Sequence, residues 1–273
     1  MKQSIYAFPA QAGTFAKHHA RIPAFAGKAL FICSLLLLSA CAAGLPSSEK
    51  LEMIRMQKQA VLADEMTQKG LQLGSPAFIR LFKSENIVET WVQDQETGRM
   101  RPFKTYPICN YSGNLGPKLA EGDRQSPEGF YTVGAGAMNP WSQYHLSFNI
   151  GFPNEYDRAH RRTGSNLMIH GNCKSEGCYA LTDPAIEEIY LLTEASIAGG
   201  HNVPVHIFPF RMTPRNMARH TDSKWYPFWQ NLKEGYDAFE RTQSPPEISL
   251  RMTHTGTHYA VKVPRNQKVA TVF

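Results

Sequence analysis

The spacing of apolar side chains changes near residue 77, and this change limits the folds that the chain can adopt. Residues 46–75 carry apolar side chains at helical intervals, which predicts a helix that ends at Gly70 or Gly74. From Ala77 onward the apolar period is two, as in a strand with one buried face. We therefore expect a tether and helix over 41–76, followed by a domain built on β-sheets.

Short strand segments recur along the rest of the chain. The 20 glycines and 18 prolines indicate many turns, which suit short strands better than a helical bundle. The pattern predicts strands at 78–82, 87–92, 101–110, 130–133, 146–150, 167–170 and 203–208, helices at 183–192 and 214–240, and a β-ribbon in the last 30 residues. The aromatic cluster Trp225–Trp229 has helical spacing, so we favour a core face over a sugar-stacking surface. These segments predict a strand-dominated α+β fold, with a main domain over 77–212 and an extension over 213–273 packed on it.

The amino-terminal segment has the organisation of a secretory signal. An apolar stretch over 29–40 follows Lys28, and its 12 residues are too few to span a bilayer as a helix. A basic region, a short apolar region and small residues at the exit predict a signal peptide over 1–40. We therefore expect an exported, periplasmic protein.

The exit of this signal offers a site for lipid attachment. Leu38-Ser39-Ala40-Cys41 resembles a bacterial lipobox, in which the cysteine thiol is acylated and becomes the new amino terminus. Ordinary cleavage near Ala40, Ala43 or Gly44 and a retained signal anchor are the alternatives. We favour lipidation of Cys41. The following residue, Ala42, is not an acidic residue of the kind associated with retention at the inner membrane, so we expect an outer-membrane anchor.

The net charge of +6 gives no reason to expect a nucleic-acid partner. Residues 1–40 hold four of the 29 basic residues and no acidic residue, so 25 basic and 23 acidic residues remain after them. A folded part so close to neutrality lacks the basic surface that DNA or RNA binding requires.

A histidine and a cysteine near position 175 could form a nucleophilic pair. His170 ends an apolar strand segment, and Cys178 follows eight residues later, directly after Gly177. An imidazole can take the proton of a thiol, and a glycine before the cysteine lets amide groups approach a carbonyl oxygen. A zinc site using His170, Cys173 and Cys178 is the rival interpretation, but it lacks a fourth ligand at familiar spacing. We therefore expect a cysteine enzyme without metal or other cofactor.

This segment resembles the catalytic motif of the L,D-transpeptidase (YkuD-type) superfamily, in which a His-Gly step precedes a Ser-x-Gly-Cys step. It is most similar to the YafK-type subgroup, which includes amidases that release protein from meso-diaminopimelate in peptidoglycan. The resemblance covers about residues 77–250. The longest matching segments are 106–113, 116–118, 122–131, 149–154, 156–160 and 209–213.

The resemblance implies a YkuD-like mixed β-sandwich with flanking helices and a set of residue roles. Cys178 matches the nucleophile, His170 the general base, and Gly171 the backbone carbonyl that orients the histidine. Gly177 and the amide of Cys178 match the oxyanion-hole positions, and Ser175 matches the loop serine. The implied reaction is attack on an amide carbonyl next to meso-diaminopimelate, which gives a thioester on the enzyme.

Two departures from the family pattern bear on the outcome of that reaction. Many transpeptidases have His before the Gly-Cys step and Arg two residues after the cysteine, where this chain has Glu176 and Ala180. Loss of the guanidinium removes a contact to a substrate carboxylate. We therefore expect hydrolysis of the amide between diaminopimelate and an attached murein lipoprotein. The alternatives are an L,D-transpeptidase or L,D-carboxypeptidase, and an inactive lipoprotein that only binds peptidoglycan.

Further residues are weaker candidates for contact with peptidoglycan. We expect Arg158 and His160 in a basic loop, with Tyr156, to hold the acidic stem peptide, and we assign substrate contacts to Tyr179 and Asn172. We expect Asp123 to cap a turn, Tyr144 and His145 to lie in a strand, and Arg211 to form a structural ion pair. Cys109 and Cys173 could form a disulfide that leaves Cys178 free, and a Cys173–Cys178 pairing is the alternative.

Overall fold

The computed structural model describes residues 44–254 and 256–264. The predicted signal peptide over 1–40 and the predicted lipidation site Cys41 lie outside these residues. In the described part of the chain, no helix combines the length and apolar character that crossing a membrane requires.

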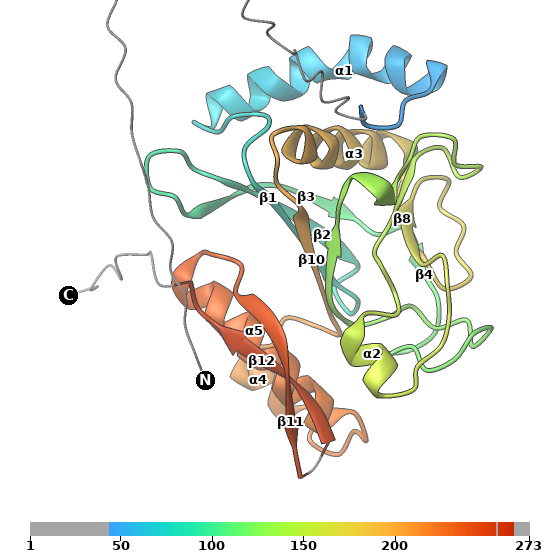
Figure 1. The fold of residues 1–273 in the computed structure, drawn as a ribbon, viewed down its shortest axis with the longest axis vertical. Coiled ribbons are helices and arrows are strands. Elements are labelled where there is room, and N and C mark those ends of the chain that lie inside the picture. The colour runs from blue at the N-terminus through green and yellow to red at the C-terminus, as the bar shows by residue number, and fades with distance from the viewer. Residues whose placement is uncertain (1–43, 255, 265–273) are drawn as a thin grey trace, which may run out of the picture. The chain divides into compact units, whose positions relative to one another are not determined.

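The elements follow the expected order of one helix, a series of strands and a C-terminal extension (Figure 1). The helices are α1 (Glu49–Gln68), α2 (Glu155–Ala159), α3 (Asp183–Ala198), α4 (Pro214–Ala218) and α5 (Tyr226–Thr242), with a 3₁₀ turn at Ala135–Ala137. The strands are β1 (Ala77–Phe82), β2 (Ile87–Gln93), β3 (Met100–Pro107), β4 (Asn110–Tyr111), β5 (Gly129–Val133), β6 (Met138–Asn139), β7 (Ser147–Asn149), β8 (Met168–His170), β9 (Tyr179–Ala180), β10 (Val203–Phe208), β11 (Glu247–Thr253) and β12 (Gly256–Lys262). The strand-dominated α+β prediction is confirmed.

Two five-stranded sheets form the body of the domain. The first has the order β3-β2-β1-β10-β5, in which only β1 and β10 are parallel. The second has the order β4-β9-β8-β7-β6, in which β8 and β9 are parallel. Ile79 and Val205 of the first sheet share one buried core with Phe148 and Ile169 of the second. Burial of these facing apolar sides holds the two sheets together as a mixed β-sandwich.

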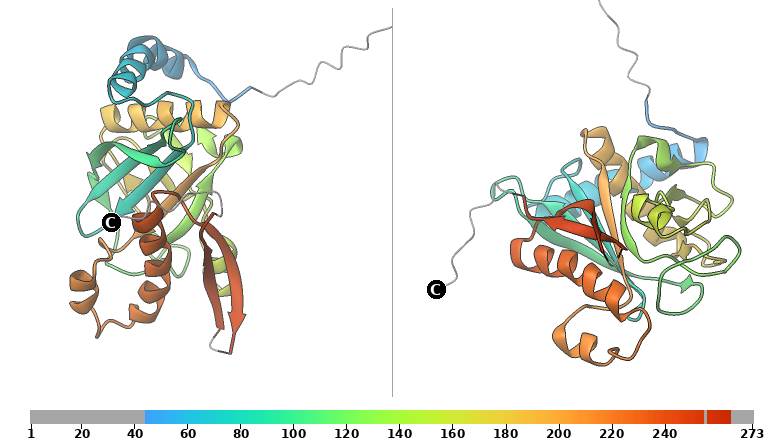
Figure 2. Two further views of the ribbon diagram at one scale, coloured as in Figure 1. Left: turned by 90° about the vertical axis from the view of Figure 1, so that its left-hand side faces the viewer. Right: turned by 60° about the horizontal axis from the view of Figure 1, so that its bottom comes forward.

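Helices α1 and α3 lie along one another beside the sandwich (Figures 1 and 2). Thr182 caps α3, with its hydroxyl accepting from the amide of Ala185, and a proline stands in the first turn. The guanidinium of Arg55 on α1 donates to both carboxylate oxygens of Glu194 on α3. Ser48, which caps α1, also donates to the carbonyl oxygen of Pro140, so the start of α1 holds the turn that precedes β7.

The C-terminal extension covers the face of the first sheet that is turned away from the second sheet. Phe239 of α5 packs on Phe78 of β1 with ring centroids 4.8 Å apart, and Tyr236 meets Phe208 of β10. Trp229 is buried and donates from Nε1 to Glu128 at 2.8 Å. The predicted core role of the Trp225–Trp229 cluster is therefore confirmed for its buried members, Phe228 and Trp229.

Three sequence-based expectations about elements are wrong. The predicted strand 101–110 divides into β3 and β4, which lie in different sheets, because Cys109 turns to donate to Ala180 on β9. The predicted helix 214–240 divides into α4 and α5, because Pro227 is accommodated in a first helical turn and not in a helix interior. Tyr144 and His145 lie in a turn and not in a strand.

Candidate active site

The parallel pair β8–β9 brings the two predicted reactive residues to one place. His170 is the last residue of β8 and pairs in register with Ala180, while Cys178 directly precedes β9. Both side chains line a cavity of about 420 Å³. The cavity is lined by Asn110, Tyr144, His170, Cys173, Lys174, Ser175, Glu176 and Cys178.

His170 is buried and held in one orientation. Its Nδ1 lies 2.6 Å from the carbonyl oxygen of Gly171, and its ring packs on Tyr144 with centroids 4.8 Å apart. A carbonyl only accepts, so Nδ1 carries the proton and Nε2 keeps a lone pair that can take another. Burial lowers the pKa of His170 below 6.5, against the opposing effect of the Gly171 carbonyl. The neutral imidazole is therefore the resting form at neutral pH.

Cys178 is a free thiol at an intermediate depth. Its Sγ accepts from the amide of Met168 at 3.4 Å and donates to the carbonyl oxygen of Asn166 at 3.7 Å. Burial raises the pKa of the Cys178 thiol above 9.0, while the Met168 amide and the Lys118 cation oppose that rise. Burial thus favours the uncharged form of both side chains, so at neutral pH the cavity holds a thiol and a neutral imidazole and not a preformed ion pair.

Three serine hydroxyls fix the backbone around the thiol. Ser126 and Ser175 donate to the carbonyl oxygen of Cys178 at 3.0 and 2.7 Å. Ser112 accepts from the amide of Gly177 at 3.0 Å and lies 3.0 Å from the hydroxyl of Ser175. The predicted oxyanion position at Gly177 therefore holds an amide that is already bonded within the protein.

Cys109 and Cys173 form a disulfide, so of the two pairings that the sequence left open this one is present. The bridge joins the start of β4 to the loop between β8 and β9, and it leaves Cys178 reduced. Because Cys173 is in the bridge, its thiolate cannot serve the rival zinc site. Among the described residues, no three His, Cys, Asp or Glu side chains gather as a metal site would require.

The structure does not bring the other predicted substrate contacts to this cavity. Tyr179 is fully buried, and its hydroxyl donates to the carbonyl oxygen of Pro127, so its side chain does not reach the cavity. Asn172 is exposed outside the cavity lining. Tyr156 and Arg158 line a different cavity, and His160 stacks on Tyr156.

The predicted basic loop is also more ordered than expected. Residues 155–159 form α2, capped reciprocally by Asn154 and Asp157. Arg162 is buried in an ion pair with Asp157 at 2.8 Å, so it serves the fold and not the surface. Two other structural roles are confirmed: Asp123 caps the turn at Leu119 and Ala120, and Arg211 pairs with Glu89.

Four residues at or near the site were missed by the sequence analysis. These are Tyr144 over the imidazole, Ser112 and Ser126 at the Cys178 backbone, and the buried cation Lys118. The dipeptide Asn139-Pro140 is a turn signal that could have removed Tyr144 from the predicted strand. No local pattern marks the serines or Lys118, because they come from the loop over 112–126, far from Cys178 in sequence.

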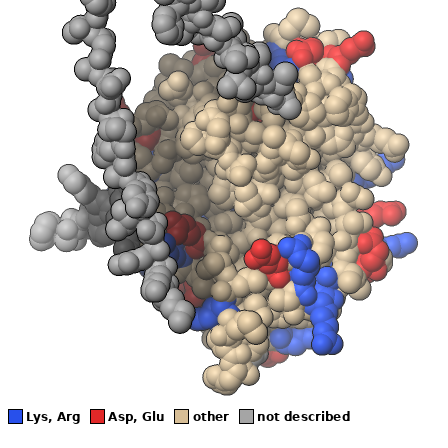
Figure 3. All heavy atoms as spheres, in the orientation of Figure 1, with Lys and Arg blue, Asp and Glu red and all other residues tan. Residues whose placement is uncertain are grey.

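Acidic and basic side chains both occur on the surface of the described part of the chain. On the face drawn in Figure 3, acidic and basic groups of the described residues lie interspersed among neutral ones. The ion pair Lys83–Glu128 is fully buried, and the Lys83 ammonium also donates to the carbonyl oxygen of Ser126 at the end of the loop over 112–126.

Comparison with known proteins identifies the family of the chain. Residues 78–207 match the family model of the L,D-transpeptidase catalytic domain (YkuD). Over 198 residues the chain is 46% identical to the "Putative L,D-transpeptidase YafK" of Escherichia coli (strain K12), covering 72% of this chain and 78% of that protein.

Two solved structures are more distant. The helical cell shape determining protein Pgp2 of Campylobacter jejuni is 18% identical, with a TM-score of 0.41 and coverage of 73% of this chain and 92% of that one. Bd1075 of Bdellovibrio bacteriovorus is 16% identical, with a TM-score of 0.37 and coverage of 68% and 82%. These likenesses are too remote to inform function. The family model and the YafK identity show that the chain belongs to the L,D-transpeptidase (YkuD) family of peptidoglycan enzymes.

Proposed function

We propose that this protein is a cysteine amidase that hydrolyses the amide joining meso-diaminopimelate of peptidoglycan to a covalently attached protein, such as a murein lipoprotein. The observation that carries the proposal is the shared cavity, in which the free thiol of Cys178 and the oriented neutral imidazole of His170 both lie. Nucleophile, base and orienting carbonyl together suit acyl transfer through a thioester.

The acylation step follows from this arrangement. The sulfur of Cys178 attacks the amide carbonyl carbon while its proton passes to Nε2 of His170, and the carbonyl oxygen takes the negative charge. The carbon–nitrogen bond then breaks, and the imidazolium returns its proton to the leaving amine. The attached protein departs with a free amino group, and the diaminopimelate carbonyl remains as a thioester on Cys178.

Deacylation uses the same base. Water attacks the thioester carbon as Nε2 of His170 takes a proton, and the carbon–sulfur bond breaks. The products are a free carboxylate on the stem peptide and the restored thiol. An amine in place of water would give a transpeptidase, so the choice depends on whether the site holds an acceptor peptide.

Two positions favour water over an acceptor peptide. Ala180 is fully buried in β9 opposite His170, so it presents no group to a substrate carboxylate. Glu176 is exposed on the cavity wall, where many transpeptidases of the family pattern have histidine, so this position adds no positive charge that would hold a second acidic peptide as acceptor. L,D-transpeptidase or L,D-carboxypeptidase activity is the second candidate, on the ground of family membership. A third is an inactive peptidoglycan-binding lipoprotein.

The proposal includes the placement of the protein in the cell. Residues 1–40 would direct export to the periplasm, and acylation of Cys41 would anchor the mature chain to the outer membrane. The intact mass of the exported protein tests this part, because acylation adds a discrete increment.

The decisive experiment for the activity is incubation of the purified chain with protein-linked sacculi. We expect release of protein by the wild type and a drop of at least about 1000-fold for Cys178→Ala, since the covalent route is lost. Release that persists in Cys178→Ala would refute the cysteine mechanism. Cross-linked or trimmed muropeptides without protein release would support the second candidate, and binding without turnover would support the third.

A further inference from the structure

The catalytic cavity carries two opposite charges that the acylation and deacylation steps do not use. Lys174 and Glu176 line it together with His170 and Cys178, and both are exposed. Among the described residues that line this cavity, these two are the only formally charged ones at neutral pH, because the imidazole and the thiol are both uncharged there. The cavity therefore offers one cation and one anion beside the reactive sulfur, with no net charge.

The backbone that carries these two side chains is held in place. Cys173, directly before Lys174, is fixed by its disulfide. The hydroxyl of Ser175, between the two charged residues, donates to the carbonyl oxygen of Cys178 at 2.7 Å. A ligand therefore has to order only the two long side chains and not the loop itself, which lowers the entropic cost of binding.

Neither charge has a partner within the described residues. Over 44–254 and 256–264, no ion pair or side-chain hydrogen bond involves Lys174 or Glu176. The two residues are two Cα–Cα steps apart, which separates their Cα atoms by at most about 7.6 Å, yet the ammonium and the carboxylate do not pair with each other. Both groups are thus free to bind a ligand that carries the opposite charges.

The proposed substrate has a matching pair of charges. In a stem peptide, one α-carbon of meso-diaminopimelate has its amino and carboxyl groups in amide bonds, whereas the other keeps a free ammonium and a free carboxylate. A short methylene chain joins the two, so the free centre lies about 6 Å from the reacting carbonyl carbon when the chain is extended. Glu176 is within reach, because its Cα lies at most about 7.6 Å from that of Cys178. The cavity, of about 420 Å³, falls in the range of about 300–1000 Å³ that small-molecule sites occupy.

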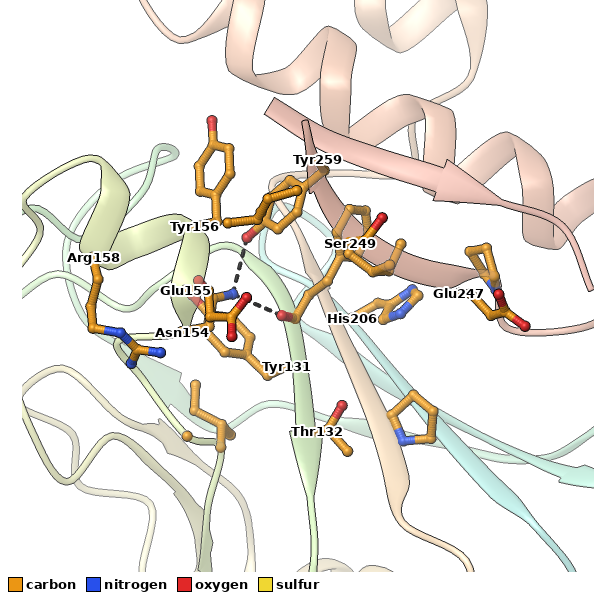
Figure 4. Close-up of a pocket in the computed structure, with 17 residues that line it drawn as sticks. Tyr131, Thr132, Asn154, Glu155, Tyr156, Arg158, His206, Glu247, Ser249 and Tyr259 are labelled. Atoms are coloured by element: carbon orange, nitrogen blue, oxygen red, sulfur yellow. Dashed lines mark hydrogen bonds between the residues drawn. The ribbon is translucent and has the colours of Figure 1, made fainter. Parts of the chain in front are cut away.

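Another pair of opposite charges lies in a separate cavity of about 540 Å³, to which α2 contributes Glu155 and Arg158 (Figure 4). This second cavity includes neither Cys178 nor His170. The Arg158 guanidinium also donates to the carbonyl oxygen of Pro153, so part of its hydrogen-bonding capacity is used within the protein. Because the reacting carbonyl and the free centre belong to one diaminopimelate residue, they must enter the cavity that holds the thiol.

We propose that Lys174 and Glu176 recognise the free zwitterionic centre of meso-diaminopimelate, with Lys174 binding its carboxylate and Glu176 its ammonium. The inference rests on the proposed amidase function, because it names the part of diaminopimelate that the enzyme recognises. A cavity with one cation and one anion suits a zwitterion better than a purely acidic or purely basic group. Lysine, which has the same ammonium but no carboxylate at this end, should be the poorer ligand.

Binding of two tripeptides tests the recognition apart from catalysis. The first probe is L-alanyl-γ-D-glutamyl-meso-diaminopimelate, and its twin has L-lysine in place of diaminopimelate. In calorimetric titrations, we expect the wild type to bind the first probe about 3- to 10-fold more tightly than the twin, the effect of one charge-assisted contact. Lys174→Gln should weaken the first probe alone and so remove the preference, whereas Glu176→Gln should weaken both probes.

Two substitutions outside the cavity are the matched controls. Arg251→Gln and Glu155→Gln each remove one exposed charge, of the same sign as Lys174 and Glu176 respectively, and neither residue lines the catalytic cavity. Both should leave the two affinities unchanged. Equal binding of the two probes by the wild type would overturn the inference without any variant. A preference that persists in Lys174→Gln, or a loss as large in the controls, would overturn it as well.

A kinetic comparison separates this inference from the proposed function. The substrate is a muropeptide that carries a single lysine on the reacting carbonyl of diaminopimelate, with the other carboxyl group either free or amidated. We expect Lys174→Gln to raise KM about 3- to 10-fold for the free form at unchanged kcat, because the contact is present in both ground and transition states, and to leave the amidated form unaffected. If Lys174→Gln changes the kinetics of both forms equally, the recognition fails and the amidase proposal stands. If the wild type cleaves neither form nor protein-linked sacculi, the amidase proposal fails, and the tripeptide titrations alone decide the recognition.

Discussion

The Nδ1 atom of His170 lies 2.6 Å from the carbonyl oxygen of Gly171, the residue that follows it. The position of that carbonyl depends on the absence of a side chain at Gly171. A Cβ there would stand 2.5 Å from Oδ1 of Asp183 and 3.0 Å from Cβ of His145. The backbone at residue 171 can therefore keep this conformation only with glycine.

Gly171→Ala should lower kcat by about 100-fold, because the shifted carbonyl no longer holds the tautomer that a general base needs. The measurement is release of protein from sacculi, with folding checked by circular dichroism. Gly136→Ala is the matched control, since nothing lies within 4 Å of a Cβ at that position. Full activity in Gly171→Ala would contradict the role of this carbonyl.

The two pKa directions predict the pH dependence of the reaction. Burial lowers the pKa of His170 below 6.5 and raises the pKa of Cys178 above 9.0. Between these limits the imidazole is neutral and the thiol protonated, so kcat/KM should be flat there and fall at lower pH as His170 takes a proton. Thiolate ultraviolet absorbance, with Cys178→Ser as blank, should stay absent at neutral pH. A thiolate signal at neutral pH would instead indicate an ion pair.

Ser126→Ala should separate the positioning of the nucleophile from its chemistry. The hydroxyl of Ser126 donates to the carbonyl oxygen of Cys178 and accepts from the amide of Ser112, both at 3.0 Å. Its loss leaves the Ser112 amide without this acceptor and the Cys178 carbonyl with only the Ser175 hydroxyl, so we expect a stability loss of about 1–3 kcal/mol and a drop in kcat of about 10-fold. Urea unfolding and protein release measure the two effects. The exposed Ser165→Ala is the control, and equal behaviour of the two variants would refute the assignment.

Lys83→Met should destabilise the protein strongly. The Lys83 ammonium is fully buried and donates to the carbonyl oxygens of Asn114, Gly116 and Ser126 and to Oε1 of Glu128. Removing it leaves the buried carboxylate of Glu128 without its cation, at a cost of about 3–5 kcal/mol in unfolding free energy. Lys83→Met combined with Glu128→Gln should recover part of that loss in urea unfolding. A double variant less stable than the single one would contradict this account.

His206 should make the fold sensitive to acid. Burial lowers the pKa of His206 to about 3 from 6.5. Between pH 6.5 and pH 3 this histidine is therefore protonated in the unfolded chain and neutral in the folded one. Its contribution to the unfolding free energy is complete above pH 6.5 and falls toward pH 3 by up to about 1.4 kcal/mol per pH unit. His206→Phe, which suits the neighbouring rings of Phe78 and Phe130, should flatten that slope by one proton. If the unfolding free energy falls with decreasing pH equally steeply in the wild type and in His206→Phe, His206 does not have this role.

The amino-acid sequence alone determined the parts of this protein that depend on near neighbours. The sequence predicted β1, β2, β5 and β10 closely, because short runs of apolar, aromatic and β-branched residues bounded by turn residues mark strands. The sequence also predicted that His170 and Cys178 lie near one another, and both line one cavity, because only the eight residues 171–178 separate β8 from its neighbour β9.

Tertiary structure decided the rest, because it sets contacts between residues distant in sequence. Ser126 and Ser112 meet Cys178 and Gly177 across 52 and 65 residues, and Cys109 meets Cys173 across 64. The side chain of Tyr179 points into the core. Successive side chains of a strand point to opposite faces, and that of the preceding residue, Cys178, faces the cavity. No local pattern encodes which strands end a sheet, so the position of β5 at the end of the first sheet was also decided by the tertiary structure.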